Sequence, residues 1–236
     1  MEKIRILDYL FPRRCPYCHE PTKPFHAPIC KGHAELFSYV KYPVCKKCGK
    51  EIGDDHAGLC YDCAQNDKPF ISNIALMNYD DAAQESMVMF KYHGRREYAE
   101  FYADEIIRQH GEKLKGMNFS LILPVPVHKS KKRSRGYNQA MEIAVRIGSA
   151  LAVPVRDDIL IRTKKTEAQK TLGAGERAMN ILDSMQVLRN LKGIGPILIV
   201  DDIYTTGSTL SACTRALISA GAQQVYGCTV CIGRDS

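Results

Sequence analysis

The chain has 236 residues, 45% of them hydrophobic, and a formal net charge of +7. This length is sufficient for one complete hydrophobic core and a small second module. No apolar run reaches the roughly 18 residues that a membrane-spanning helix needs, and the first residues lack the apolar centre of a secretory signal peptide. These features exclude an integral membrane protein. We expect a cytoplasmic protein whose first residues form a short amphipathic helix.

The positive charge is concentrated in one part of the chain. Residues 121–180 carry 12 basic and 5 acidic side chains, whereas the charges of the remaining segments cancel. An excess of this kind on one segment predicts contact with a polyanion.

The first chemical signal in chain order is a series of cysteines. Seven of the ten cysteines lie within the first 63 residues and, together with one histidine, form four pairs with a spacing of two residues. The pairs are Cys15 with Cys18, Cys30 with His33, Cys45 with Cys48, and Cys60 with Cys63. Paired ligands at this spacing are typical of tetrahedral zinc on two knuckles, and the last two pairs make a complete four-cysteine zinc site.

The first two pairs leave alternatives open. His19 or His26 could replace His33 as the fourth ligand, and a three-cysteine remnant without metal fits the spacing too. Spacing alone also permits a cross-braced arrangement, in which the pair at 15 and 18 shares a metal with the pair at 45 and 48. Disulfides are disfavoured in a cytoplasmic protein. The remaining cysteines lie in apolar segments and are predicted core residues: Cys213, Cys228 and Cys231.

The domain organisation follows from the cysteines and from the apolar pattern. Residues 1–68 are predicted to form a zinc-ribbon module and residues 69–236 an α/β domain. Apolar runs alternate with helical periodicity from residue 69 onward, which predicts an open, mainly parallel sheet flanked by helices. The expected strands are 71–79, 121–127, 159–161, 197–200 and 225–232, and the expected helices are 81–91, 97–110, 138–151 and 210–220.

A basic loop is expected between the strand at 121–127 and the helix at 138–151. It has five cations in seven residues, from Lys129 to Arg135. Its place at the carboxyl end of a buried strand, where open α/β sheets bind ligands, favours diphosphate binding. Nucleic-acid contact and a solvent-facing charged run are the alternatives.

Residues 162–180 are polar, contain two glycines and show no apolar periodicity. A stretch of this kind fits a mobile lid over a polyphosphate, and it fits an exposed surface loop equally well. The pattern alone does not decide between the two.

Residues 197–210 carry the most specific signal. Four branched apolar residues predict a buried parallel strand, Asp201 and Asp202 stand at its carboxyl end, and a hydroxyl-rich turn opens the following helix. The residues of the turn are Thr205, Thr206, Gly207, Ser208 and Thr209. Backbone N–H groups and hydroxyls of such a turn can wrap a phosphate, and the carboxylates can accept hydrogen bonds from ribose hydroxyls.

This segment resembles the PRPP-binding motif of type I phosphoribosyltransferases at every position, where PRPP is 5-phosphoribosyl-1-pyrophosphate. The resemblance implies that Asp201 and Asp202 hold ribose hydroxyls, directly or through Mg²⁺, and that Thr205–Thr209 hold the 5′-phosphate. It also implies a pyrophosphate site formed by Lys129, Lys131, Lys132 and Arg133. It further implies a flexible lid that includes Arg162, Thr166, Gln169 and Arg177. The reaction would displace pyrophosphate at C1 through an oxocarbenium-like transition state, carried by positioning, metal and cations.

The order of the separated motifs resembles the ComF (ComFC) family of competence-associated proteins over nearly the whole chain. The motifs are the zinc ribbon, Phe90-Lys91-Tyr92-x-Gly94, Pro124-Val125-Pro126 with its basic loop, Arg135-Gly136-Tyr137-Asn138-Gln139, the segment from Arg162 to Asn180, and the PRPP motif. His33 departs from the cysteine that this family often has at that position.

Two functions follow from the resemblance. The first is a PRPP-binding protein of DNA uptake and natural transformation, in which single-stranded DNA and a competence helicase or ATPase engage the ribbon and the basic segment. The alternative is an active phosphoribosyltransferase of nucleotide metabolism or salvage, unrelated to DNA uptake. The sequence identifies no acceptor for the ribosyl group.

Overall fold

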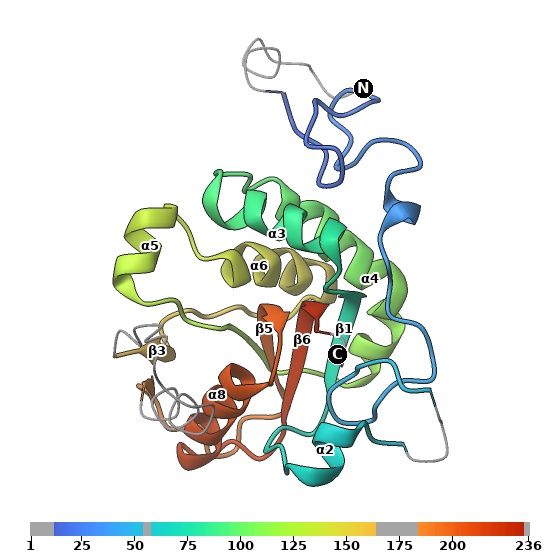
Figure 1. The fold of residues 1–236 in the computed structure, drawn as a ribbon. Helices are drawn as coiled ribbons and strands as arrows, with labels where there is room; N and C mark the ends of the chain where they lie inside the picture. The colour runs from blue at the N-terminus through green and yellow to red at the C-terminus, as the bar shows by residue number, and fades with distance from the viewer. Residues whose placement is uncertain (1–11, 54–57, 164–183, 234–236) are drawn as a thin grey trace, which may run out of the picture.

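A four-stranded parallel sheet forms the centre of the molecule (Figure 1). The computed structural model describes residues 12–53, 58–163 and 184–233. The strands of the sheet are β1 (Asn73–Asn78), β2 (Leu121–Pro124), β5 (Ile197–Tyr204) and β6 (Val225–Ile232). They are hydrogen-bonded in the order β1-β6-β5-β2, and the pairings between them are parallel, as the apolar runs predicted.

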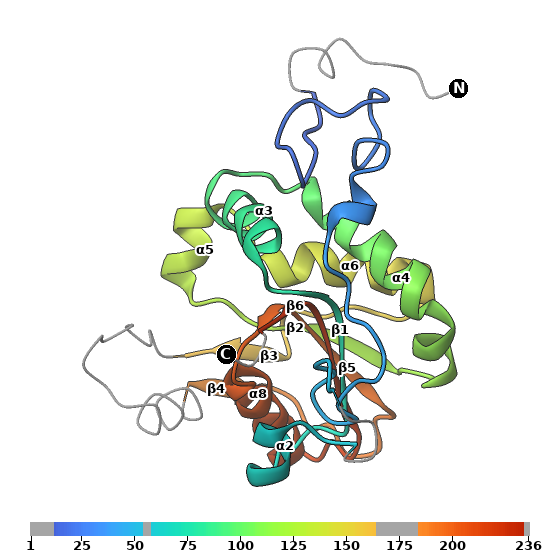
Figure 2. The same ribbon diagram turned by 45° about the vertical axis from the view of Figure 1, so that its right-hand side comes forward.

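Helices cover both faces of this sheet (Figures 1 and 2). The helices α3 (Asp81–Tyr92), α4 (Tyr98–Gly116) and α6 (Gln139–Leu151) lie on one face, and α8 (Ser208–Ser219) lies on the other. Because side chains alternate along a strand, Leu198 and Val200 pack with α4 and α6, whereas Ile197 and Ile199 pack with α8. The sheet thus separates two hydrophobic cores. No helix in the described part of the chain has the length and apolarity that crossing a membrane requires.

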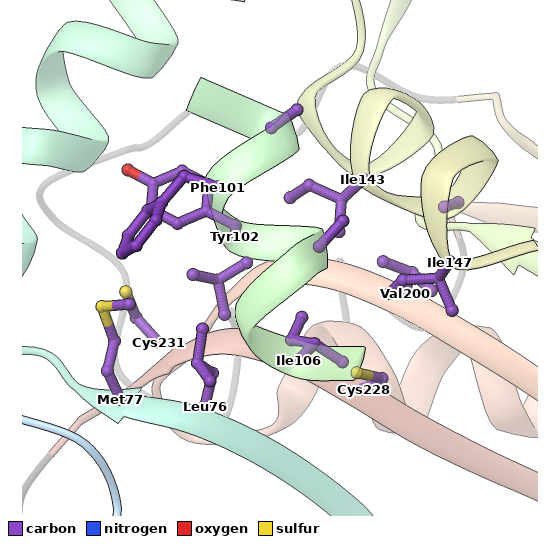
Figure 3. Packing of buried hydrophobic residues seen from close by; sticks show 14 of the residues in the cluster. Leu76, Met77, Phe101, Tyr102, Ile106, Ile143, Ile147, Val200, Cys228 and Cys231 are labelled. Carbon is purple, nitrogen blue, oxygen red and sulfur yellow. The ribbon is translucent and has the colours of Figure 1, made fainter. Parts of the chain in front are cut away.

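The core beneath α4 and α6 is shown in Figure 3, where aromatic side chains of α4 lie above aliphatic and sulfur-containing side chains of β1 and β6. Cys228 and Cys231 are fully buried in this core, and Cys213 of α8 is fully buried in the other. The prediction that these three cysteines are core residues is confirmed.

A second, antiparallel sheet consists of β3 (Leu160–Arg162) and β4 (Met185–Val187). The strand expected at 159–161 is therefore present, although it does not join the main sheet. The sequence did not predict β4, because three residues are too few to show a period. Some expectations lie outside the described residues: the amphipathic helix at the start of the chain and the lid positions Thr166, Gln169 and Arg177.

The segment predicted as a basic loop is instead a helix, α5 (Lys129–Arg135). Lysine and arginine are good helix formers, and the ring of His128 accepts a hydrogen bond from the N–H of Ser130 at 3.2 Å. Gly136 ends the helix with a φ of 81°. The five cations are tolerated because seven residues make about two turns, which distributes the charges around the helix.

The cysteine-rich segment has two halves that pack on opposite faces of the sheet (Figures 1 and 2). Residues 38–40 connect them along the outer edge of β1, where the N–H of Val40 donates to the carbonyl of Leu76 at 3.1 Å. The first half includes the 3₁₀ helix η1 (Ala34–Leu36) and contacts α4. The second half includes α2 (Tyr61–Gln65) and lies beside α8. The domain boundary at residue 68 stays a prediction.

Candidate functional site

The second half of the ribbon brings four sulfur atoms within 4.8 Å of one another, those of Cys45, Cys48, Cys60 and Cys63. The Sγ atoms of Cys48 and Cys60 are 3.6 Å apart. Tetrahedral zinc with Zn–S bonds of about 2.3 Å requires sulfur atoms about 3.8 Å apart, so the cluster fits the ion. Hydrogen bonding between the two side chains lowers the pKa of Cys45 and raises that of Cys48, so Cys45 is the more readily ionised member of this pair.

The first half of the ribbon brings together a second group of ligand atoms within 4.8 Å, from Cys15, Cys18, Cys30 and His33. Cys15 Sγ lies 3.4 Å from Nδ1 of His33. Zinc with one sulfur and one nitrogen ligand requires a separation of about 3.5 Å, so this group fits zinc as well. His19 contacts the Tyr98 hydroxyl at 3.0 Å instead of joining the cluster. His26 also lies outside it, and because the two clusters pack on opposite faces of the sheet, they are not cross-braced.

The turn between β5 and α8 is shaped to receive an anion. Gly207 has a φ of 75°, and a Cβ at this position would collide with the Tyr204 hydroxyl, so the turn requires glycine. The hydroxyls of Thr206 and Ser208 lie 2.7 Å apart at the start of α8. Backbone N–H groups at the start of a helix have no partner within the helix, and the hydroxyls add further donors beside them.

The two aspartates lie within β5 and not after it, which corrects the sequence prediction. Pairing between β5 and β6 continues past them to Tyr204. Consecutive residues of a strand point to opposite faces of the sheet. Asp201 therefore lies on the α8 face, where it lines a cavity, and Asp202 lies on the α3 face. The two carboxylates are consequently not equivalent.

The charge environments of the two aspartates differ accordingly. Burial and the neighbouring charge of Asp202 raise the pKa of Asp201 to about 7. Asp202 forms an ion pair with Lys91, whose Nζ lies 2.9 Å from Oδ1. Although burial opposes the charge, this ion pair raises the pKa of Lys91. Asp202 thus has a cation of its own, whereas Asp201 titrates near neutral pH.

Further cations converge near the aspartates. Partial burial and the charges of Arg135 and Arg162 lower the pKa of Lys131, which places α5 and β3 close together. Burial also lowers the pKa of Arg162, an effect that the charge of Asp201 opposes. All the cations predicted to bind pyrophosphate are exposed on α5: Lys129, Lys131, Lys132 and Arg133. A group of mutually repelling cations favours an anionic ligand.

A cavity of about 480 Å³ opens between β5, α8 and the ribbon. The α/β domain lines it with Asp201, Tyr204, Thr205, Thr206, Gly207, Ser208, Thr209, Leu210 and Thr229. The ribbon side lines it with Asp62, Asn66 and Lys68. A cavity of this size with convergent polar groups is typical of a small-molecule site.

Sequence reasoning missed two lysines of this region. Lys68 follows the last zinc ligand by five residues and entered the sequence analysis only as the last residue of the predicted ribbon module, although a lysine that is 9% exposed needs a partner. Lys91 stands in a motif that the sequence analysis named without giving the lysine a role. In the sequence, Lys91 is a cation near the end of a predicted amphipathic helix. That position does not indicate which strand the side chain contacts.

Two protein-family models match separate parts of the chain. A model described as a double zinc ribbon domain matches residues 6–64, and a model described as a phosphoribosyl transferase domain matches residues 134–236. Together with the parallel sheet, the flanking helices and the cysteine clusters, these matches confirm the expected α/β fold with an N-terminal zinc ribbon.

The chain is also similar to curated proteins over most of its length. It is 25% identical to competence protein F of Haemophilus influenzae, over 90% of this chain and 93% of that protein. It is 24% identical to DNA utilization protein YhgH of Escherichia coli, over 93% of this chain and 97% of that protein. It is 26% identical to competence protein ComFC of Bacillus subtilis, over 82% of this chain and 79% of that protein.

Proposed function

We propose that this chain, a homologue of the ComF competence proteins with a double zinc ribbon and a phosphoribosyltransferase-type domain, binds PRPP in the cavity between β5, α8 and the ribbon. The observation that carries the proposal is the turn at Thr205–Thr209, which opens α8 into this cavity. The cavity is also lined by Asp201, which lies three residues before Tyr204, the last residue of β5. The proposed phosphate site and the proposed ribose site are therefore adjacent.

The roles of the residues follow from their chemistry. The N–H groups and hydroxyls of Thr205–Thr209 hold the 5′-phosphate, and Asp201, which lines the cavity, holds ribose hydroxyls. Asp202 faces α3 and pairs with Lys91, so its expected contact with the ribose stays a prediction. Carboxylate oxygens are the ligands that Mg²⁺ prefers, so the aspartates also fit Mg²⁺ carried in with PRPP. When bound, Mg²⁺ would neutralise part of the pyrophosphate charge.

The pyrophosphate is assigned to the cations beside the aspartates. The charge of Arg162 contributes to the lowered pKa of Lys131, and a polyanion beside these two cations would relieve their repulsion. Lys129, Lys132 and Arg133 of α5 add positive charge on the approach to the site. Arg162 begins the proposed lid, whose other residues lie outside the described part of the chain.

The cellular role that we propose is in DNA uptake in the cytoplasm, in keeping with the names of the relatives in Haemophilus influenzae and Bacillus subtilis. Single-stranded DNA and a competence helicase or ATPase are the proposed partners. The basic helix α5 supports a nucleic-acid contact, because cations on an exposed helix can pair with a phosphate backbone. The alternative is an active phosphoribosyltransferase of nucleotide salvage.

The test is a calorimetric titration with PRPP and Mg²⁺, followed by a pyrophosphate-release screen over nucleobases. Wild-type protein should bind PRPP, and Asp201→Ala should weaken binding by at least tenfold. Asp158→Ala, which removes an exposed carboxylate paired with Arg156, serves as the matched control and should bind normally. Absence of PRPP binding by the wild-type protein would contradict the proposal.

The same variants separate the two cellular roles. Pyrophosphate release with one base, abolished in Asp201→Ala, would establish the salvage enzyme. Binding of PRPP without release, together with single-stranded DNA binding that weakens steeply between 50 and 200 mM salt on the scale of several phosphate contacts, would support the role in DNA uptake.

A further inference from the structure

We propose that the second half of the zinc ribbon is a wall of the phosphoribosyl site and that Lys68 is a ligand of the 5′-phosphate. The inference rests on the proposed function, since it assumes that a phosphoribosyl compound occupies the cavity. It goes beyond that function because it gives the zinc centre a part in ligand binding.

The contacts of Lys68 place its ammonium at the phosphate turn. Its Nζ donates to the carbonyl of Thr206 at 3.1 Å and pairs with Asp62 Oδ2 at 2.9 Å. The side chain is only 10% exposed, so these contacts hold it in a defined position. An ammonium has three N–H donors, and these two contacts use two of them. The third is left for an acceptor in the cavity.

The charge balance of the cavity calls for this cation. Among the described residues that line it, Lys68 is the single lysine or arginine, whereas Asp62 and Asp201 are acidic. The turn at Thr205–Thr209 carries hydroxyls and N–H groups but no charged side chain. A phosphate monoester brings about −1.5 to −2 charges at neutral pH. A dianion beside two carboxylates requires a cation, and the ribbon side supplies it.

Tyr204 is a second, independent sign that the turn receives a ligand. The residue is 3% exposed and lines the cavity, and its hydroxyl has no hydrogen-bond partner among the residues that the structure describes. The hydroxyl lies against Gly207, within the phosphate turn. A buried hydroxyl without a partner is costly. A phosphate oxygen in the turn would provide the acceptor that the Tyr204 hydroxyl lacks.

The zinc centre holds this wall in place. The helix α2 starts directly after the ligand Cys60 and contains the ligand Cys63, with Asp62 between them. Asp62 in turn holds Lys68. The four cysteines belong to the same hydrophobic cluster as Tyr204 and Leu210. Zinc at this centre and phosphate in the turn therefore share one packed unit, and each should strengthen the binding of the other.

The first experiment compares three ligands by isothermal titration calorimetry: PRPP with Mg²⁺, ribose 5-phosphate, and inorganic pyrophosphate. Lys68→Gln should weaken PRPP and ribose 5-phosphate by about 10- to 100-fold, the effect of losing a hydrogen bond to a charged group, and change pyrophosphate affinity less than twofold. Lys46→Gln is the matched control, because Lys46 is an exposed lysine of the same ribbon half that does not line the cavity. It should bind all three ligands normally.

The outcomes distinguish the inference from the function on which it rests. If wild-type protein binds PRPP and Lys68→Gln binds ribose 5-phosphate equally well, the inference fails and the proposed function stands. If wild-type protein binds none of the phosphoribosyl compounds, the proposed function fails first. Equal losses for pyrophosphate and ribose 5-phosphate in Lys68→Gln would also overturn the inference, because a general structural defect produces that pattern.

Tyr204→Phe tests the site without removing a charge or a fold contact. Because the hydroxyl has no described partner, its removal should leave the unfolding temperature unchanged or raise it, and yet weaken ribose 5-phosphate by about 3- to 10-fold. Unchanged ribose 5-phosphate affinity would exclude the hydroxyl as a ligand.

Zinc release gives a readout that does not depend on catalysis. A colorimetric chelator should extract zinc from the wild-type protein more slowly when ribose 5-phosphate is saturating, and this protection should be lost in Lys68→Gln. The Cys18→Ser variant, which retains the second cluster, isolates the signal of that cluster. Identical release rates with and without the ligand would disprove the coupling.

Discussion

The ammonium of Lys91 lies 2.9 Å from a carboxylate oxygen of Asp202, and each side chain is only 15% exposed. The pair joins the last turn of α3 to β5 on the face opposite the cavity. It explains why two neighbouring aspartates differ, since Asp202 has a directly paired cation, whereas Asp201 is buried beside the charge of Asp202 and has no such ion pair in the described part of the chain.

Removing one partner of this pair should cost stability. Asp202→Asn removes the ion-pair partner of the Lys91 ammonium, and we expect a loss of about 3 kcal/mol in the free energy of unfolding, measured in urea, at the lower end of the range for buried pairs because each side chain is 15% exposed. Lys91→Met should cost a similar amount, and the double variant less than the sum, because the second change removes the stranded charge. Asp158→Asn breaks an exposed pair with Arg156 and should change stability little. Additive losses in the double variant would show that the pair is not coupled.

Asp201→Asn should have the opposite effect in the absence of ligand. Burial raises the pKa of Asp201 to about 7, so above the ordinary pKa of about 4 the folded state resists an ionisation that the unfolded state permits. This penalty grows as the pH rises and is complete above pH 7. The stability advantage of Asp201→Asn over the wild type should therefore grow by about 1–2 kcal/mol between pH 5.5 and pH 8. Urea unfolding at both pH values measures it, and a constant difference would refute the assignment.

Sequence reasoning was effective where function depends on residues close together in the chain. The zinc ligand pairs and the turn from Thr205 to Thr209 are local patterns, and the structure brings each set together. Periodicity located β1, α3, α6, β5 and β6 because each buries a continuous face.

The relations that sequence reasoning missed depend on the fold. Lys68 is 138 residues from its acceptor Thr206, and Lys91 reaches a strand more than a hundred residues later. A local sequence pattern cannot predict contacts between residues so far apart in the chain. The end of β5 was also misplaced, because two aspartates look like the end of a strand unless the hydrogen bonds to β6 are known.

The two zinc clusters should make different contributions to stability. Cys63→Ser and Cys18→Ser should each lower the zinc content from two ions to one per chain, measured by mass spectrometry. Cys63 lies in the core shared with Leu210 and Tyr204, so its loss should also lower the unfolding temperature of the α/β domain. Cys18 is only partly buried and lies away from that core, so its substitution should lower the temperature less. Equal decreases in unfolding temperature for the two variants would show that the second cluster does not stabilise the α/β domain more than the first cluster does.

Gly207→Ala should damage the phosphate turn through two separate effects. The residue has a φ of 75°, and the added Cβ would collide with the Tyr204 hydroxyl. Gly193 has a similar φ of 80° but open space around the position of a Cβ, so Gly193→Ala isolates the backbone strain of about 1–2 kcal/mol. We expect Gly207→Ala to cost more than Gly193→Ala in urea unfolding and to weaken ribose 5-phosphate binding by at least tenfold, with no such effect in Gly193→Ala. The ring carbons Cζ and Cε2 of Tyr204 also lie within 3.0 Å of the added Cβ, so adding Tyr204→Phe to Gly207→Ala removes only the nearest contact and should restore a small part of the lost stability at most. Equal losses of unfolding free energy in the two alanine variants would mean that the Tyr204 side chain moves aside without cost. Gly207 would then be required for its backbone conformation alone.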